Sequence, residues 1–161
     1  MTTALARLLG VRLPLIQAPM AGVQGSDLAL AVSAAGALGS LPCAMLGTDA
    51  LRGELQRIAA VPGAVVNLNF FCHRLPAPDA RRDATWRDHL APFYRDAGLD
   101  PAMPWPPATR APFDSQTADL IEVFRPRVVS FHFGLPDPAL LARLRGWGAR
   151  ILSSATTVEE G

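Results

Sequence analysis

The sequence of 161 residues contains no lysine, and all fifteen of its basic residues are arginine. Without lysine the chain has no Walker-type phosphate-binding lysine, no Schiff-base nucleophile and no lysine general base. Its fourteen acidic residues bring the formal net charge to +1, and no block of like charge stands out. We therefore expect neither nucleic acid nor an anionic membrane surface as a partner.

Cysteine and long apolar runs are also scarce. Cys43 and Cys72 belong to no CxxC or His-x-x-x-His pattern, so no metal site is predicted and both thiols are expected to be reduced and near the core. No apolar run approaches the roughly 20 residues of a membrane span. Because Arg7 and Arg12 interrupt the apolar N-terminal positions, no secretory segment is expected, and the expected location is the cytoplasm.

The sequence does contain an alternation of short apolar runs and helical patterns. The predicted strands are Leu13–Ala18, Ala37–Leu41, Ala64–Phe71, Val128–Phe133 and Ala149–Ser154. Helices are predicted between them: Leu28–Ala35 capped by Ser26-Asp27, one capped by Thr48 and running to about Ala60, Ser115–Phe124 capped by Asp114, and Pro138–Trp147. Such alternation favours an α/β fold with a parallel sheet, either doubly wound or a (β/α)8 TIM barrel. No GxGxxG follows the first strand, which argues against the dinucleotide-binding fold, whereas a whole barrel needs about 250 residues.

The strand that reads VVSFHFGLP holds the main candidate for chemistry. Its alternation places Val129, Phe131 and Phe133 on one face, and Val128, Ser130 and His132 on the other. Gly134 ends the strand, so His132 is expected at its carboxyl end, where parallel α/β folds build active sites. A hydrogen-bonded structural histidine is the alternative.

Two amides share the equivalent face of the preceding strand. In AVVNLNFF, Asn67 and Asn69 alternate with Val66, Leu68 and Phe70. They either hydrogen-bond to neighbouring strands or hold a polar ligand.

Residues 73–113 interrupt the βα rhythm and are predicted to form an insertion or lid, with a helix around Trp86–Asp96. Trp86, Phe93, Tyr94 and Trp105 could cover a pocket or dock that helix, while His73 and His89 are expected to have surface or packing roles. At the other end of the chain, Thr156 and Glu159 have the spacing of a capping box, which predicts that a helix begins there and that further βα units follow.

Five ordered motifs resemble the nitronate monooxygenase family, formerly called 2-nitropropane dioxygenases: LPLIQAPMAG, GALGSLPCAML, VNLNFFCH, VVSFHFGLP and ILSSATTVEEG. The segment DARRDATWRDHLAPFYRDAGLD resembles the insertion of that family as well. The resemblance implies that residues 1–161 are the N-terminal part, about five βα units, of an FMN-dependent TIM barrel. That barrel oxidises alkyl nitronates with dioxygen to nitrite and an aldehyde or ketone.

The resemblance also implies roles for individual residues. Ala18, Pro19, Met20 and Ala21 would line the flavin, Asn69 would hydrogen-bond to it, and His132 would be the catalytic base. The family's phosphate-binding loops have no counterpart in this sequence. Residues 1–161 alone are therefore expected to bind FMN weakly or not at all, to show no nitronate oxidation, and to aggregate or form a homodimer. Two alternatives are an NAD(P)H-dependent flavin reductase of the quinone or enoyl reductase type, and a non-catalytic remnant.

Overall fold

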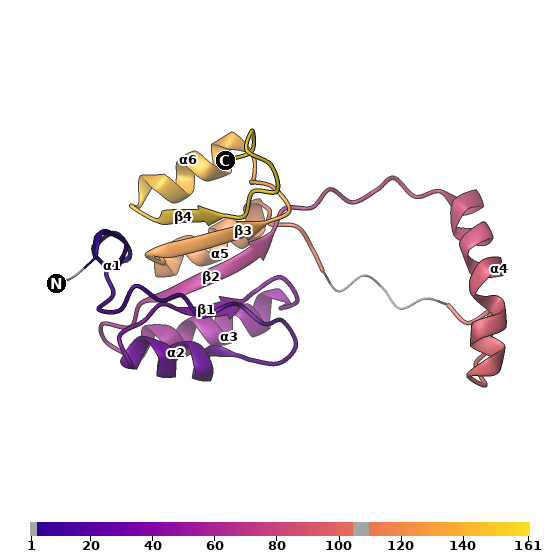
Figure 1. Cartoon of the computed structure of the whole chain (residues 1–161), viewed down its shortest axis with the longest axis horizontal. Coiled ribbons are helices and arrows are strands. Elements are labelled where there is room, and N and C mark those ends of the chain that lie inside the picture. Colours follow the sequence, from indigo (N-terminus) through magenta and orange to yellow (C-terminus); the bar gives the residue numbers. More distant parts are fainter. Residues whose placement is uncertain (1–2, 105–109) are drawn as a thin grey trace. The chain divides into compact units, whose positions relative to one another are not determined.

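The computed structural model describes residues 3–104 and 110–161 and divides the chain into two compact units. The sheet unit comprises Met1–His73 and Arg110–Gly161, and the insert unit comprises Arg74–Thr109. Figure 1 labels the helices and strands of each unit.

The sheet unit contains four parallel strands that are neighbours in chain order: β1 (Gly39–Pro42), β2 (Val66–Phe71), β3 (Val128–His132) and β4 (Arg150–Ser153). A doubly wound sheet reverses its strand order at a switch point, whereas the strands of a barrel follow one another without reversal. The predicted α/β fold of the barrel type is therefore confirmed for this part of the chain.

The predicted first strand, Leu13–Ala18, is wrong as a full strand, because only one parallel bridge forms between Ile16 and Leu38 in the described chain. Leu15 N donates to Leu13 O at 2.8 Å, which makes a tight turn around Pro14. Proline has no N–H to give to a ladder, so regular pairing cannot extend through it. The segment still runs parallel to the sheet, since Gln17 N donates to Leu38 O at 2.9 Å.

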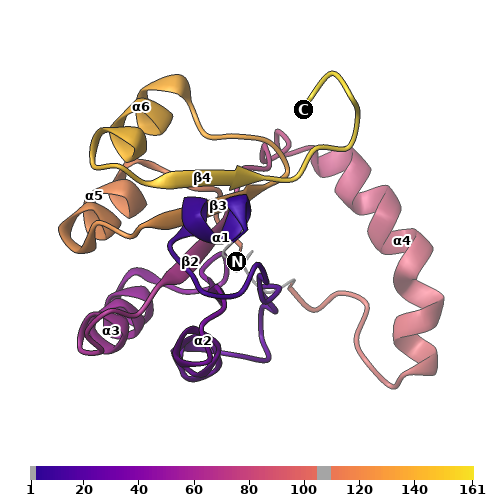
Figure 2. The ribbon, with the colours of Figure 1, turned by 60° about the vertical axis from the view of Figure 1, so that its left-hand side comes forward.

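Four helices alternate with the strands: α2 (Ser26–Ala34), α3 (Thr48–Ala59), α5 (Ser115–Phe124) and α6 (Pro138–Gly146). Figure 2 shows them together on one side of the sheet. The strand face toward them is apolar and forms the core with Leu41, Leu68, Phe70, Val129 and Phe131. We call this the outer face. The opposite, inner face carries polar side chains. The short helix α1 (Ala4–Leu9) precedes the sheet.

Local contacts explain where the helices begin and end. Asp114 caps α5 as predicted, because its Oδ1 accepts from Thr117 N at 2.8 Å. The predicted caps at Ser26 and Thr48 are wrong, because α2 and α3 begin at these residues and follow Gly25 and Gly47. At the start of α2, Glu54 Oε2 accepts from Ser26 N at 2.8 Å. Helix α2 also packs unusually close to β1, since a Cβ at Gly39 would lie 2.0 Å from the backbone oxygen of Ala29.

The insert unit contains the helix α4 (Ala80–Asp96), which begins before the predicted Trp86. Asp79 explains the earlier start, because its Oδ1 accepts from Arg81 N and Arg82 N at 3.1 and 3.0 Å. Trp105 lies outside the described residues. The predicted lid role of this unit stays a prediction.

The predicted capping box pairs the wrong glutamate. Glu160 Oε2, not Glu159, accepts from Thr156 N and Oγ1 at 2.7 and 2.9 Å, and the segment is a turn rather than an α-helix. These hydrogen bonds from Thr156 lower the pKa of the Glu160 carboxyl group.

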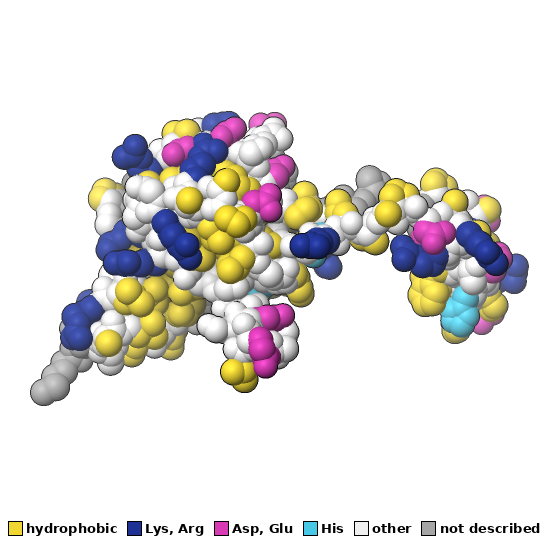
Figure 3. All heavy atoms as spheres, turned by 90° about the horizontal axis from the view of Figure 1, so that it is seen from above, with side chains coloured by type: hydrophobic (Ala, Val, Ile, Leu, Met, Phe, Trp, Pro, Cys, Tyr) yellow, Lys and Arg dark blue, Asp and Glu magenta, His cyan; other side chains and the backbone are white. Residues whose placement is uncertain are grey.

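Charged side chains of both signs are interspersed over the face shown in Figure 3. No helix in the part of the chain that the structure describes is long and apolar enough to cross a membrane.

Candidate active site

The carboxyl ends of the strands bring three side chains to one edge of the sheet. Phe71 lies opposite His132 in the register of β2 and β3, and Ser154 follows β4. His132 is half-buried at the end of β3, which confirms the strand-end position predicted for it. This edge is where parallel α/β folds place their active sites.

Ser154 holds one nitrogen of the His132 ring. The distance between His132 Nδ1 and Ser154 Oγ is 2.9 Å, and Nε2 has no hydrogen-bond partner among the described residues. A ring that donates its Nδ1–H to Ser154 keeps the Nε2 lone pair for a substrate proton. The sequence showed that Ser154 follows a strand end, but not that it would contact His132.

A polar ladder crosses the inner face of β1, β2 and β3, formed by Ser40, Asn67, Ser130 and Asn69. Asn67 Nδ2 donates to Ser40 Oγ at 3.0 Å and to Ser130 Oγ at 2.9 Å. Asn69 Nδ2 also donates to Ser130 Oγ, at 2.9 Å. All four side chains are buried, so the prediction that both amides share the face of Ser130 is confirmed.

The ladder leaves an amide oxygen unpaired. Asn67 Oδ1 is buried and has no partner among the described residues, although Asn67 is only 2% exposed. Buried polar atoms are rarely left without a hydrogen bond, so this oxygen is available to a donor that the described chain does not supply. The strand-bridging alternative is thus confirmed for the amide nitrogen of Asn67, and the ligand-binding alternative stays a prediction.

The segment Ala18–Ala21 follows the Ile16 bridge. Ala18, Met20 and Ala21 are exposed and Pro19 is half-buried. Two carbonyl oxygens of the segment already accept hydrogen bonds, that of Ala18 from Gln17 Nε2 and that of Met20 from Val23 N. The preceding Gln17 ties it to β1, since Gln17 Oε1 accepts from Ser40 N at 2.9 Å.

A second glutamine strengthens this connection. Gln17 Nε2 donates to Gln24 Oε1 at 2.8 Å, and Gln24 Nε2 donates to Ser40 O at 2.5 Å. Neither glutamine was predicted from the sequence to be a site residue. The sequence feature that could have identified them is a glutamine on each side of the APMAG segment.

Phe133 departs from the predicted alternation, which placed it on the outer face with Phe131. Its φ angle is +65°, and Gly134 follows with a φ of +102°. This left-handed turn ends the strand and directs the ring to the inner-face residue Phe71, 4.9 Å away between ring centroids. The expected position is therefore wrong, because the alternation of a strand stops where the extended backbone stops.

The other histidines have different surroundings. The ring of His73 lies 6.3 Å from that of Phe71, and its Nδ1 is buried without a partner among the described residues. His89 stacks on Trp86 in α4, with ring centroids 5.3 Å apart. These contacts agree with the packing role expected for both.

The two cysteines are free thiols. Desolvation raises the pKa of Cys43 strongly and raises the pKa of the half-buried Cys72 to about 11. Both thiols are therefore poor nucleophiles near neutral pH.

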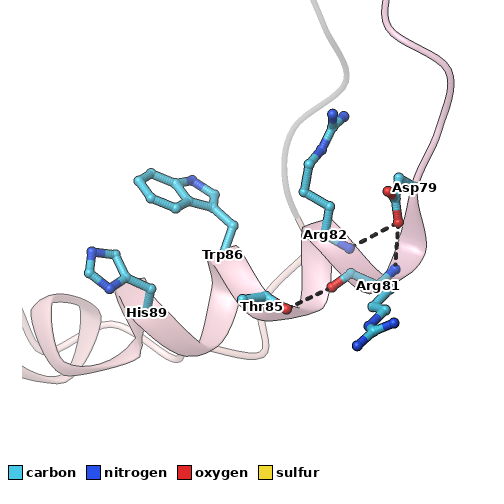
Figure 4. A pocket seen from close by; sticks show the side chains of 6 residues that line it. All are labelled: Asp79, Arg81, Arg82, Thr85, Trp86 and His89. Atoms are coloured by element: carbon cyan, nitrogen blue, oxygen red, sulfur yellow. Dashed lines mark hydrogen bonds between the residues drawn. The ribbon is translucent and has the colours of Figure 1, made fainter.

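A surface hollow lies against α4 within the insert unit, and Figure 4 shows its lining residues. They are Asp79, Arg81, Arg82, Thr85, Trp86 and His89. Asp79 caps the first turn of α4, so the backbone N–H groups of Arg81 and Arg82 already donate hydrogen bonds to its carboxylate. The hollow therefore lacks the open helix terminus that would favour an anion.

A family model described as "Nitronate monooxygenase" matches residues 2–161. The chain belongs to the nitronate monooxygenase family. The family resemblance expected from the five motifs is thus confirmed. Roles for individual residues of this family member stay predictions.

Relatives of this family member cover nearly all of it. It is 40% identical to the nitronate monooxygenase of Paraburkholderia phytofirmans, over 98% of this chain and 43% of the relative. It is 37% identical to the nitronate monooxygenase of Pseudomonas aeruginosa, over 99% of this chain and 46% of the relative. The chain therefore spans less than half the length of these relatives.

A solved structure agrees with the fold. The chain superposes on the nitroalkane oxidase from Streptomyces ansochromogenes with a TM-score of 0.78 and 33% sequence identity. The match covers 98% of this chain and 44% of that chain. This match supports the N-terminal portion of a TIM barrel as the fold.

Proposed function

We propose that the whole protein oxidises alkyl nitronates with dioxygen, releasing nitrite and an aldehyde or ketone, with FMN as its cofactor. Membership of the nitronate monooxygenase family supports the reaction class. The observation that carries the proposal is the His132 imidazole at the carboxyl edge of β3, held at Nδ1 by Ser154.

His132 acts as the base or as the substrate-binding cation. Neutral imidazole takes a carbon-bound proton from a nitroalkane at Nε2, because that proton is unusually acidic and imidazole titrates near neutral pH. If the substrate arrives as a nitronate anion, the charged imidazolium binds it instead. Ser154 serves both roles, since it can accept the Nδ1–H in either protonation state.

The residues at the inner face fit the ring system of a flavin. That ring presents both an N–H group and carbonyl oxygens, and it is uncharged near neutral pH. The polar ladder offers a buried amide oxygen in Asn67 and contains no ionisable side chain. The exposed segment Ala18–Ala21 adds backbone N–H groups and the carbonyl oxygens of Pro19 and Ala21.

In this proposal Asn69 hydrogen-bonds to FMN, and Ala18, Pro19, Met20 and Ala21 line it. FMN, when bound, supplies the electron transfer and the oxygen chemistry that the side chains of this site cannot. Ser130 holds the Asn69 amide, because Asn69 Nδ2 donates to its Oγ.

Steady-state assays of the full-length, FMN-loaded protein test the proposal. We expect nitrite release and oxygen uptake with an alkyl nitronate, and slow oxidation of NADH or NADPH with a quinone. The opposite ranking would favour the NAD(P)H-dependent reductase. Flavin binding without either activity would favour a non-catalytic protein.

A further inference from the structure

Phe133 has a backbone conformation that its side chain disfavours. Its φ of +65° lies in the left-handed region, which a residue with a bulky side chain rarely adopts. Strained residues of this kind persist only where surrounding contacts hold them, and they cluster at functional sites.

The core does not explain why Phe133 is held in this way. Its ring is 65% exposed and contributes nothing to the buried cluster of the outer face. Phe131 fills that cluster, with ring centroids 5.2 Å from Phe113 and 6.4 Å from Phe70. The strained turn therefore removes Phe133 from the side where hydrophobic packing would stabilise it.

The turn instead places Phe133 beside the candidate base. Its ring centroid lies 6.3 Å from that of His132 and 4.9 Å from that of Phe71. Phe71 itself lies 6.4 Å from His132. The two phenylalanines form an apolar wall, which we define as Phe71 and Phe133, next to the imidazole.

We propose that this apolar wall binds the alkyl chain of the substrate and that Phe133 is a specificity-determining residue. The inference rests on the proposed function. His132 engages the polar nitro or nitronate end, so a carbon chain attached to that end extends over rings in contact with the imidazole. Because neither ring carries a charge, the wall suits an uncharged carbon chain attached to the anionic nitronate group.

A chain-length series tests the wall. The full-length, FMN-loaded protein is assayed with straight-chain nitronates of increasing length, each at several concentrations. We expect kcat/KM to rise about two- to fourfold per added methylene, the upper value corresponding to complete burial. In Phe133→Asn the slope should flatten, with the loss growing with chain length and residing in KM rather than kcat. Asparagine is the chosen replacement because it tolerates a left-handed φ while removing the ring.

A stability measurement separates this role from a structural one. Glycine adopts a φ of +65° without strain, so Phe133→Gly should unfold at the same temperature as wild type or higher. Val123→Ala, at a 75% exposed position on α5, is the control and should keep the wild-type slope.

The outcomes are distinct. A wild-type protein that oxidises no nitronate contradicts the proposed function. Oxidation without a chain-length slope, or a slope that Phe133→Asn retains, overturns the inference alone. A fall in unfolding temperature for Phe133→Gly as large as that of Phe131→Ala would also overturn it, by making Phe133 a packing residue.

Discussion

Ser154 Oγ lies 2.9 Å from His132 Nδ1, so a hydroxyl group that follows β4 orients the imidazole at the end of β3. We predict that Ser154→Ala lowers kcat/KM about three- to tenfold, the effect of losing one hydrogen bond. Steady-state kinetics of both proteins with the same nitronate measure this ratio.

Ser153→Ala is the matched control for Ser154→Ala. The Ser153 hydroxyl donates to the backbone oxygen of Ser154 at 3.3 Å and does not contact His132. Its kcat/KM should equal that of wild type. An unchanged kcat/KM in Ser154→Ala would show that the hydrogen bond has no part in the reaction.

The polar ladder makes a prediction about stability. Ser130 Oγ accepts from two buried amides, whereas Ser40 Oγ accepts from one side chain of the ladder. Ser130→Ala should lower the free energy of unfolding by about 2–4 kcal/mol and Ser40→Ala by about half as much, because each unpaired buried donor is costly. Urea unfolding of both variants measures this, and equal losses would contradict it.

The structure explains which of the sequence-based predictions succeeded. Period-two alternation correctly placed Asn67, Asn69, Ser130 and His132 on one face, because those residues lie in strands with regular pairing. It failed at Leu13–Ala18, where Pro14 interrupts the ladder, and at Phe133, where the backbone becomes left-handed. Apolar–polar alternation alone does not show at which residue the extended conformation ends.

Contacts between segments that are distant along the chain could not be predicted from the sequence either. His132 and Ser154 are separated by a helix, and Gln24 reaches Ser40 through a turn and a helix. Such pairs follow from strand register, which two short apolar runs do not specify by themselves. The family motifs predicted which residues form the site, and the strand register accounts for the hydrogen bonds between them.

Replacing Gly39 and Gly53 by alanine should change the stability of the chain in opposite directions. Gly39→Ala would place a methyl group 2.0 Å from the Ala29 oxygen, so α2 must move and at least about 3 kcal/mol of stability should be lost. Gly53→Ala in α3 meets no atom within 4 Å and should stabilise the chain by about 0.5–1 kcal/mol. Thermal unfolding of the two variants checks the sign of each change.

Cys72 should react slowly with alkylating reagents. Desolvation raises the pKa of its thiol from 9.0 to about 11, so at pH 8 the thiolate is about one hundredfold less abundant than in an unperturbed cysteine. Because the buried thiol resists ionisation, this group should leave stability unchanged below about pH 9 and lower it as the pH rises from about 9 to about 11. Iodoacetamide labelling at pH 8, native and in urea, compares the rates, and equal rates would disprove the shielding.

The central claim is that His132 begins the oxidation of a nitroalkane by a flavin enzyme. It is tested most directly by anaerobic stopped-flow mixing of the FMN-loaded full-length protein with a neutral nitroalkane, without NADH. We predict rapid loss of oxidised-flavin absorbance in wild type and a rate at least about one hundredfold lower in His132→Asn with FMN still bound. No flavin reduction by any nitroalkane or nitronate in wild type, or an unchanged rate in His132→Asn, would contradict the claim.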